Sequence, residues 1–206
     1  MPESPTDPVF WNQRYLAGQT PWDFGGVPLA LRRYLAGASA RRRESPRALI
    51  PGCGSGHEIA AFADAGYDVT AIDISSAAAA RARAQTGART GVQVIEGDFF
   101  THVFPDGPFD CIYERTFLCA LPPALWPRMV ARYAELLRPG GALAGFYLFG
   151  EKEDGPPFGL ATDEPERLFS AAFTLTRDEP VPAAESLEFF AGREHWQERI
   201  RKTKAS

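Results

Sequence analysis

The sequence is poor in the residues that usually build metal and thiol chemistry. Its 206 residues include only three cysteines and three histidines. None of His57, His102 and His195 is spaced from another histidine or from a cysteine as zinc ligands are, and the cysteines form no CxxC pair. We therefore expect no protein-bound catalytic metal.

Long apolar runs and a surplus of charge of one sign are also missing. No run is long enough to cross a bilayer, and the start, MPESPTDPVFW, lacks the basic and apolar stretches of a signal peptide. The net charge of −4, with mixed signs, favours neither nucleic acid nor an anionic membrane as a partner. We expect a cytoplasmic monomer with reduced cysteines.

What is present is a regular alternation of apolar runs and helix-forming stretches. Strands are predicted at 48–51, 68–73, 92–98, 109–114 and 142–149, and helices at 57–66, 75–85 and 124–141. After a further helix beginning near Pro165, segments 173–181 and 186–200 predict an antiparallel hairpin at the sheet edge. The expected fold is α/β: a doubly wound, mostly parallel, seven-stranded Rossmann-like sheet.

The length suits one domain over residues 1–206. We expect a core at 48–149, and a loop followed by the hairpin at 150–206. The first 35 residues hold three aromatic side chains ahead of any strand, so this segment is expected to cover part of the core.

A glycine-rich turn follows the first predicted strand. Gly52, Gly54 and Gly56 form GxGxG, and His57 stands where the dinucleotide fingerprint GxGxxG has its last glycine. The first two glycines free the backbone to approach a ligand, whereas His57 counts against NAD. A purely structural turn is the alternative.

Acidic residues follow the next two strands. Asp73 ends the second strand about 20 residues after the turn, where a carboxylate can accept hydrogen bonds from ribose hydroxyls. After the third strand, Asp98 can accept from an adenine amino group and Phe99 can lie against the ring. Because the carboxyl ends of adjacent parallel strands share one crevice, we predict an adenosine site there; a turn aspartate beside a core phenylalanine is the alternative.

Together these features resemble the class I S-adenosylmethionine-dependent methyltransferases. The segments FWNQRYLAGQTPWDFG, IPGCGSG, DFF, YERTFLCALPP and GPPF resemble the thiopurine methyltransferase family, most of all its halide and thiol methyltransferase branch. The resemblance runs from residue 10 to about 160. Three positions depart from the relatives' usual residues: Tyr15 for tryptophan, Glu114 for aspartate and Phe158 for tyrosine.

The resemblance implies S-adenosylmethionine as cofactor, S-adenosylhomocysteine as its product and an N-terminal lid at 1–35. The residues it implies as cofactor contacts are Trp11, Tyr15, Trp22, Gly52, Gly54, Asp73, Ile74, Asp98, Phe99 and Glu114. Aromatic faces attract a sulfonium cation, by about 0.5–2 kcal/mol, and Glu114 can pair with the ammonium group. The alternative for Trp11 and Trp22 is a segment simply pinned to a core.

The acceptor side is expected to follow the fourth strand. Arg115, Thr116, Phe117 and Phe158 are candidates for positioning a small-molecule thiol or anion, although Arg115 suits a structural ion pair equally well. Cys119 is favoured as a small buried apolar residue. No serine–histidine–aspartate set or carboxylate pair is evident, so methyl transfer to an acceptor that ionises by itself fits best.

The predicted function is therefore methyl transfer from S-adenosylmethionine to a small soft nucleophile, foremost a thiol or thiolate. A halide or thiocyanate methyltransferase is the first alternative. A non-catalytic nucleoside-binding module is a second, and the aromatic segment argues against it. An NAD-dependent oxidoreductase is disfavoured by His57 and by the lack of a hydride-transfer set.

Overall fold

The structure is a computed structural model that describes residues 4–38, 45–150, 154–190 and 192–203. Most of the basic stretch at 38–47 and the start of the predicted loop at 151–165 lie outside these residues. The chain divides into two compact units, residues 1–103 and 104–206, which are described separately. The expected single domain with its three parts stays a prediction.

The predicted fold class is confirmed. Seven strands have the order β3-β2-β1-β4-β5-β7-β6, parallel except for β7, which runs antiparallel to both of its neighbours. The strands are β1 (Arg47–Pro51), β2 (Asp68–Asp73), β3 (Val92–Glu96), β4 (Phe109–Glu114), β5 (Leu137–Leu148), β6 (Phe173–Pro180) and β7 (Glu194–Arg201). None of the helices described is long and apolar enough to cross a membrane.

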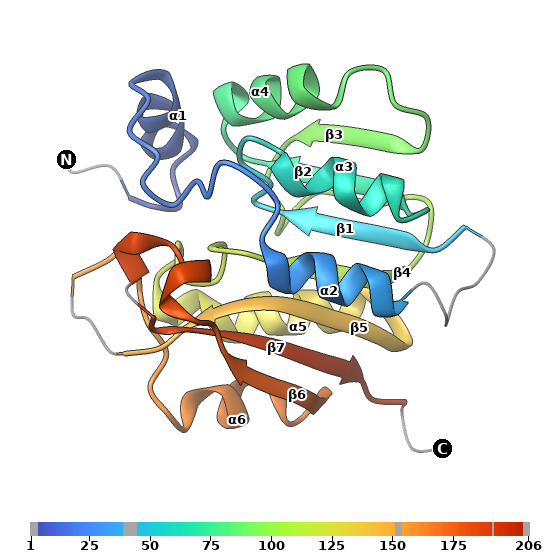
Figure 1. The fold of residues 1–206 in the computed structure, drawn as a ribbon, viewed down its shortest axis with the longest axis vertical. Helices are drawn as coiled ribbons and strands as arrows, with labels where there is room; N and C mark the ends of the chain where they lie inside the picture. The colour runs from blue at the N-terminus through green and yellow to red at the C-terminus, as the bar shows by residue number, and fades with distance from the viewer. Residues whose placement is uncertain (1–3, 39–44, 151–153, 191, 204–206) are drawn as a thin grey trace. The chain divides into compact units, whose positions relative to one another are not determined.

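The first unit contains β1, β2 and β3 with helices α3 (His57–Asp64) and α4 (Ser76–Thr86) between them (Figure 1). Strand β2 is almost entirely buried, which explains its continuous apolar run. Ser75 caps α4 by accepting a hydrogen bond from the Ala78 amide at 3.2 Å. The buried face of α4 is formed mainly by alanines, which let the helix approach the neighbouring elements closely.

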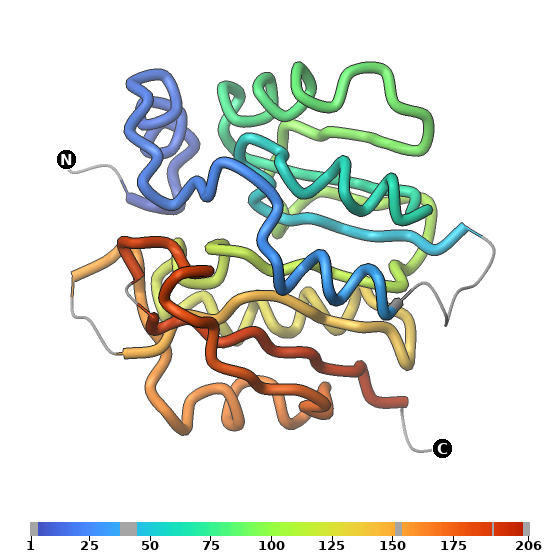
Figure 2. The backbone as a smooth tube through the Cα atoms, in the orientation of Figure 1, coloured from blue at the N-terminus to red at the C-terminus, as the bar shows by residue number. Residues whose placement is uncertain are grey.

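Two helices precede the first strand, α1 (Pro8–Leu16) and α2 (Leu29–Ala38). Figure 2 shows the chain leaving α1 through an irregular link before it enters α2. Asp7 caps α1, accepting from the Val9 amide at 2.9 Å, and Pro8 occupies the first turn, where no amide donor is needed. Helix α1 lies against α4, and α2 lies against α3.

In the second unit β4 pairs in parallel with β5, and α5 (Trp126–Leu136) connects them after a short 3₁₀ turn (Pro123–Leu125). The predicted helix ran to Gly141, which is wrong: the chain becomes extended at Leu137, whose side chain is fully buried. Arg138 precedes a proline and is thereby biased away from helix. Residues 138–141 then form an irregularity opposite β4, in which Gly140 has a φ of +75°.

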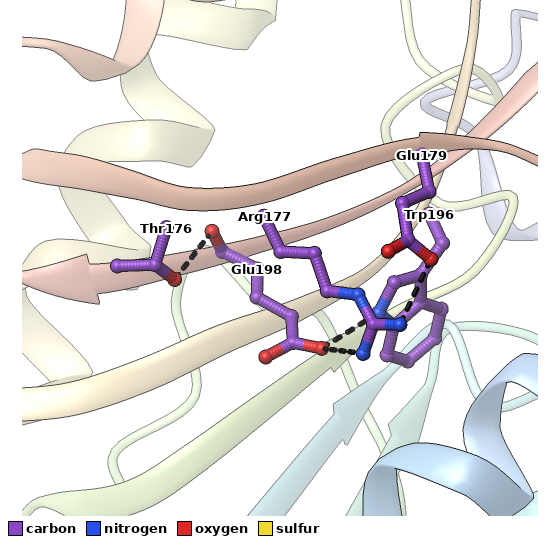
Figure 3. A network of polar contacts seen from close by, with 5 residues as sticks. All are labelled: Thr176, Arg177, Glu179, Trp196 and Glu198. Carbon is purple, nitrogen blue, oxygen red and sulfur yellow. Dashed lines mark hydrogen bonds and ion pairs between the residues drawn. The ribbon is translucent and has the colours of Figure 1, made fainter.

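The rest of this unit is α6 (Glu164–Phe169), β6, two 3₁₀ turns (Ala183–Glu185 and Glu188–Phe190) and β7. The predicted antiparallel edge is therefore confirmed, with β6 outermost. A polar network joins the two strands: Arg177 pairs with Glu179 at 2.8 Å and with Glu198 at 3.3 Å, while Thr176 and Trp196 donate to Glu198 (Figure 3). Charged side chains on an edge strand discourage pairing with another chain.

Candidate active site

The glycine turn of the first unit leaves β1 in a conformation that side chains rarely adopt. Gly52, Gly54 and Gly56 have φ angles of +58°, +54° and +81°. A methyl group on Gly56 would lie 2.8 Å from the Ala82 Cβ of α4. Gly56 thus allows α4 to approach the turn closely, and His57 stands where the dinucleotide fingerprint has its last glycine.

Asp73 ends β2 next to this turn. Its carboxylate accepts from the Gly54 amide at 2.9 Å and from the Ser75 amide at 2.8 Å. The side chain is only 8% exposed, and burial raises the pKa of Asp73 to about 6, against the opposing effect of the Ser75, Gly54 and Ile74 amides. Each oxygen keeps a second lone pair, so the carboxylate can still accept from a ribose hydroxyl.

The raised pKa of Asp73 predicts a pH-dependent affinity for S-adenosylhomocysteine. Ribose hydroxyls donate best to the ionised carboxylate, so the Kd should be constant above pH 7 and rise up to about tenfold per pH unit below pH 6. Calorimetric titration between pH 5 and 8 measures this. The contribution to folding has the opposite sign, because folded Asp73 holds its proton more tightly: it is most favourable below pH 4 and declines as the pH rises through 6.

Asp73→Asn separates this effect from other titrating groups. The variant should bind more weakly, and the part of the pH dependence that belongs to Asp73 should disappear. The same slope in the wild type and the variant would show that another group causes it.

The remaining adenosine candidates follow β2 and β3. Ile74 is half-exposed directly after Asp73, and the Gly97 amide donates to the Asp73 carbonyl at 2.9 Å, which joins the two strand ends. Asp98 is half-buried and accepts from the Phe100 amide at 2.8 Å, whereas Phe99 is buried. Asp98 thus shapes its own turn, and the assigned contacts with adenine stay predictions.

The three N-terminal aromatics gather around the glycine turn. Trp22 makes edge-to-face contacts with Trp11 and Tyr15, with ring centroids 5.3 and 5.9 Å apart. The Trp22 Nε1 group donates to the Tyr15 hydroxyl at 3.1 Å, and a methyl group on Gly54 would lie 2.6 Å from the same oxygen. Tyr15 is 4% exposed, whereas both tryptophans are half-exposed, so the tryptophans are the more available for a ligand.

Asn12 fixes α1 to the start of α4, a contact that the sequence did not reveal. Its side-chain oxygen accepts from the Ser76 hydroxyl and the Ala77 amide, both at 2.9 Å, and from the Ser75 hydroxyl at 3.2 Å. Ser75 also donates its amide to the Asp73 carboxylate, so Ser75 links the aromatic segment to that carboxylate through two hydrogen bonds.

Asp23 makes a second such connection, on the glycine turn itself. Its carboxylate accepts from the Ser55 hydroxyl at 2.6 Å and lies 2.9 Å from the His57 Nε2 atom. His57, the residue that departs from the dinucleotide pattern, thus contacts the N-terminal segment. The segment is anchored at both ends of the aromatic cluster, and the expected lid motion stays a prediction.

In the second unit Glu114 ends β4 and is fully buried. One carboxylate oxygen accepts from the amides of Phe117 and Leu118, both at 2.9 Å, and the other accepts from the Tyr133 hydroxyl at 2.6 Å. Burial raises the pKa of Glu114 to about 7, although all three donors oppose the shift. The carboxylate therefore organises the turn after β4, and its assigned pairing with the cofactor ammonium stays a prediction.

Arg115 is 8% exposed and lies among structural partners. Its guanidinium is 3.8 Å from the Glu194 carboxylate and 4.1 Å from the centre of the Phe146 ring. Glu194 in turn accepts from the Ser186 hydroxyl and from the Leu187 amide. These contacts favour the structural ion pair over an anion-binding role.

The other acceptor candidates are brought together in this unit. Thr116 and Phe117 are half-exposed, and the Phe158 amide donates to the Cys119 carbonyl at 2.7 Å, which places the half-exposed Phe158 beside the same turn. Cys119 lies in an apolar cluster with Leu148, Leu187 and Phe190. Burial raises the pKa of its thiol far above the usual range, which supports the apolar role.

No group of three or more histidine, cysteine or acidic side chains able to hold a metal ion occurs in the part of the chain that the structure describes. Asp73 and Glu114, the two buried carboxylates that end β2 and β4, are instead engaged by backbone amides and, at Glu114, by a hydroxyl. What they offer a ligand is a buried carboxylate beside a glycine turn and aromatic faces, which suits a nucleoside carrying a positive charge.

Comparison with known proteins identifies the family. The sequence profile described as thiopurine S-methyltransferase matches residues 6–204. The chain belongs to the thiopurine S-methyltransferase family. The Arabidopsis thaliana protein named "Probable thiol methyltransferase 2" is 32% identical over 77% of this chain and 70% of its own length. Thiocyanate methyltransferase 1 of Brassica oleracea is 33% identical, over 73% and 67%.

A bacterial relative and a solved structure are also similar, the latter in fold. Thiopurine S-methyltransferase of Vibrio parahaemolyticus is 28% identical over 80% of this chain and 82% of its own length. The structure of a Burkholderia thailandensis N1-methyltransferase with bound S-adenosylhomocysteine has a TM-score of 0.72 at 21% identity, covering 96% of this chain and 87% of that one. The thiopurine S-methyltransferase family uses S-adenosylmethionine, so the predicted cofactor and enzyme class are confirmed at family level.

Proposed function

We propose that this member of the thiopurine S-methyltransferase family methylates a small soft nucleophile, foremost a thiol as its thiolate. The observation that carries the proposal is the state of Glu114. This carboxylate follows β4, where an acceptor base would be expected, yet it is fully buried and engaged by three donors. An acceptor that ionises by itself needs no such base.

The proposed reaction is an in-line displacement. A lone pair on the acceptor sulfur forms a bond to the methyl carbon while the bond from that carbon to the sulfonium sulfur breaks. The products are a methyl thioether and S-adenosylhomocysteine. The thiol proton leaves to water before the transfer, so no protein group changes its protonation state. The protein contributes alignment and the exclusion of water.

The residues of the first unit are assigned to cofactor binding. Asp73 would accept from the ribose, Asp98 from the adenine amino group, and Trp11 and Trp22 would face the sulfonium. The support is local: the buried carboxylate, the glycine turn with its positive φ angles and the half-exposed indoles occur within one unit. Above pH 7, where Glu114 is ionised because its pKa is about 7, its negative charge would favour binding of the ammonium group.

A panel assay with methyl-labelled S-adenosylmethionine tests the acceptor. Aryl thiols, alkyl thiols, thiopurines, bisulfide, thiocyanate and iodide are compared with a catechol and a primary amine. We expect transfer to sulfur to be the fastest. Efficient methylation of the catechol or the amine, with sulfur acceptors and iodide inert, would contradict the proposal.

A halide or thiocyanate methyltransferase is the second candidate, favoured by the thiocyanate methyltransferase among the similar proteins. Iodide and thiocyanate turnover above that of every thiol in the panel would select it. Labelled cofactor that binds but is never consumed with any acceptor would instead support the nucleoside-binding module. We further propose that the protein acts as a cytoplasmic monomer on a small molecule.

A further inference from the structure

We propose that Tyr133 is a positioning residue that acts through Glu114 to hold the turn at residues 115–118, and thereby sets how the acceptor is presented. The expected effect on acceptor kinetics rests on the proposed function, whereas the support of the turn by Tyr133 does not depend on it. Tyr133 lies on α5, 16 residues beyond Phe117, the last of the three acceptor candidates that directly follow β4.

The turn contains a backbone conformation that needs support. Thr116 has a φ of +56°, in the left-handed region that glycine tolerates and a β-branched residue does not. Residues held in such conformations persist only where their surroundings over-determine them, and they gather at functional sites. Thr116 is also the first half-exposed residue after the buried end of β4.

The support comes from α5. The Tyr133 hydroxyl donates to Glu114 at 2.6 Å, and the other Glu114 oxygen receives the amides of the two residues that follow Thr116. Trp126, on the same helix, donates from Nε1 to the Leu118 carbonyl at 2.9 Å. Helix α5 therefore holds Leu118 in two ways: Trp126 binds its carbonyl directly, and Tyr133 binds Glu114, which accepts from its amide.

The consequence for the acceptor follows from which residues move together. If the turn relaxes, Thr116 and Phe117 move with it. Phe158 should move as well, because the Phe158 amide donates to the Cys119 carbonyl, which directly follows the turn. The glycine turn and Asp73 belong to the other unit and keep their own hydrogen bonds. Loss of the Tyr133 hydroxyl should therefore change acceptor kinetics more than cofactor binding, which depends on this network only through the proposed pairing of Glu114 with the ammonium group.

Tyr133→Phe tests this, with Tyr147→Phe as the matched control. Both tyrosines are almost completely buried in the second unit, but the Tyr147 hydroxyl is not among the three donors that hold Glu114, and the Arg199 guanidinium lies 4.8 Å from the centre of the Tyr147 ring. Tyr133→Phe should raise the acceptor KM roughly tenfold and change the Kd of S-adenosylhomocysteine by clearly less, while Tyr147→Phe changes neither. An unchanged KM in Tyr133→Phe, or equal changes in both variants, would overturn the proposal.

Native-state amide exchange gives a second readout that needs no turnover. The Phe117 and Leu118 amides should lose protection in Tyr133→Phe and keep it in Tyr147→Phe. In the Tyr133→Phe background, Thr116→Gly should restore protection, because glycine adopts this φ without support. Unchanged protection of the two amides in Tyr133→Phe would overturn the proposed support of the turn by Tyr133. If the wild-type protein methylates no acceptor while the Phe117 and Leu118 amides lose protection in Tyr133→Phe, the proposed function is wrong but the structural role of Tyr133 is supported.

Discussion

Asp73→Ala is expected to weaken the binding of S-adenosylhomocysteine by about 2–4 kcal/mol, which is roughly 30- to 900-fold in Kd. The carboxylate is the proposed acceptor for the ribose hydroxyls, and hydrogen bonds to a charged group are the stronger kind. The substitution also removes the acceptor for the Gly54 and Ser75 amides, so the turn that carries the ligand loses its support. Isothermal titration calorimetry at pH 8 measures the change.

Asp68→Ala is the matched control. Asp68 lies in the same strand but at its exposed, opposite end. Its replacement should leave the Kd within about twofold, as is usual for a surface position. Wild-type affinity in Asp73→Ala would remove Asp73 from the site. Equal losses in both variants would point to a general disturbance of β2.

The second large effect is expected on stability. Glu114→Ala should lower the free energy of unfolding by about 2–4 kcal/mol, because three buried donors lose their acceptor at once. Glu114→Gln keeps an oxygen that accepts from the two amides, and its NH2 group can donate to the Tyr133 hydroxyl oxygen in a reversed hydrogen bond, so it should lose less than half as much. Urea denaturation followed by tryptophan fluorescence measures both.

Glu135→Ala serves as the comparison, because Glu135 is exposed and pairs only with Arg132 of its own helix among the contacts described. This substitution should change the free energy of unfolding by less than about 0.5 kcal/mol. If Glu114→Ala were no more destabilised than Glu135→Ala, the Glu114 network would have no structural role, and the proposal for Tyr133 would fall with it.

Local signals predicted most elements of the fold. The bounds of β2 and β4 agree with the sequence prediction because each is a short apolar run that ends in an acidic residue. The helix predicted at 75–85 agrees closely with α4, which Ser75 caps and which ends at Thr86. The end of α5 was missed because Leu137 satisfies the helical pattern equally well, and only its pairing with Phe109 makes it extended.

The site was predictable by residue type and less so by partner. Asp73 and the glycine turn follow from strand ends alone. The contacts of Asn12 with α4 and of Asp23 with His57 join residues 34 to 65 positions apart, with no local pattern to announce them. The role of Glu114 depends on a hydroxyl that α5 brings from 19 residues away. Such pairs depend on packing between elements, which periodicity does not encode.

The most direct test of the central claim is the pH dependence of single-turnover methyl transfer to two thiols of different acidity. An alkyl thiol has a pKa near 8.5, and an aryl thiol is more acidic by roughly two units. If the acceptor ionises by itself, the half-maximal rate should fall at each thiol's own pKa, so the two profiles should separate by the difference. A single midpoint shared by both thiols, such as one near pH 7 where Glu114 titrates, would contradict this account and make a protein group the base.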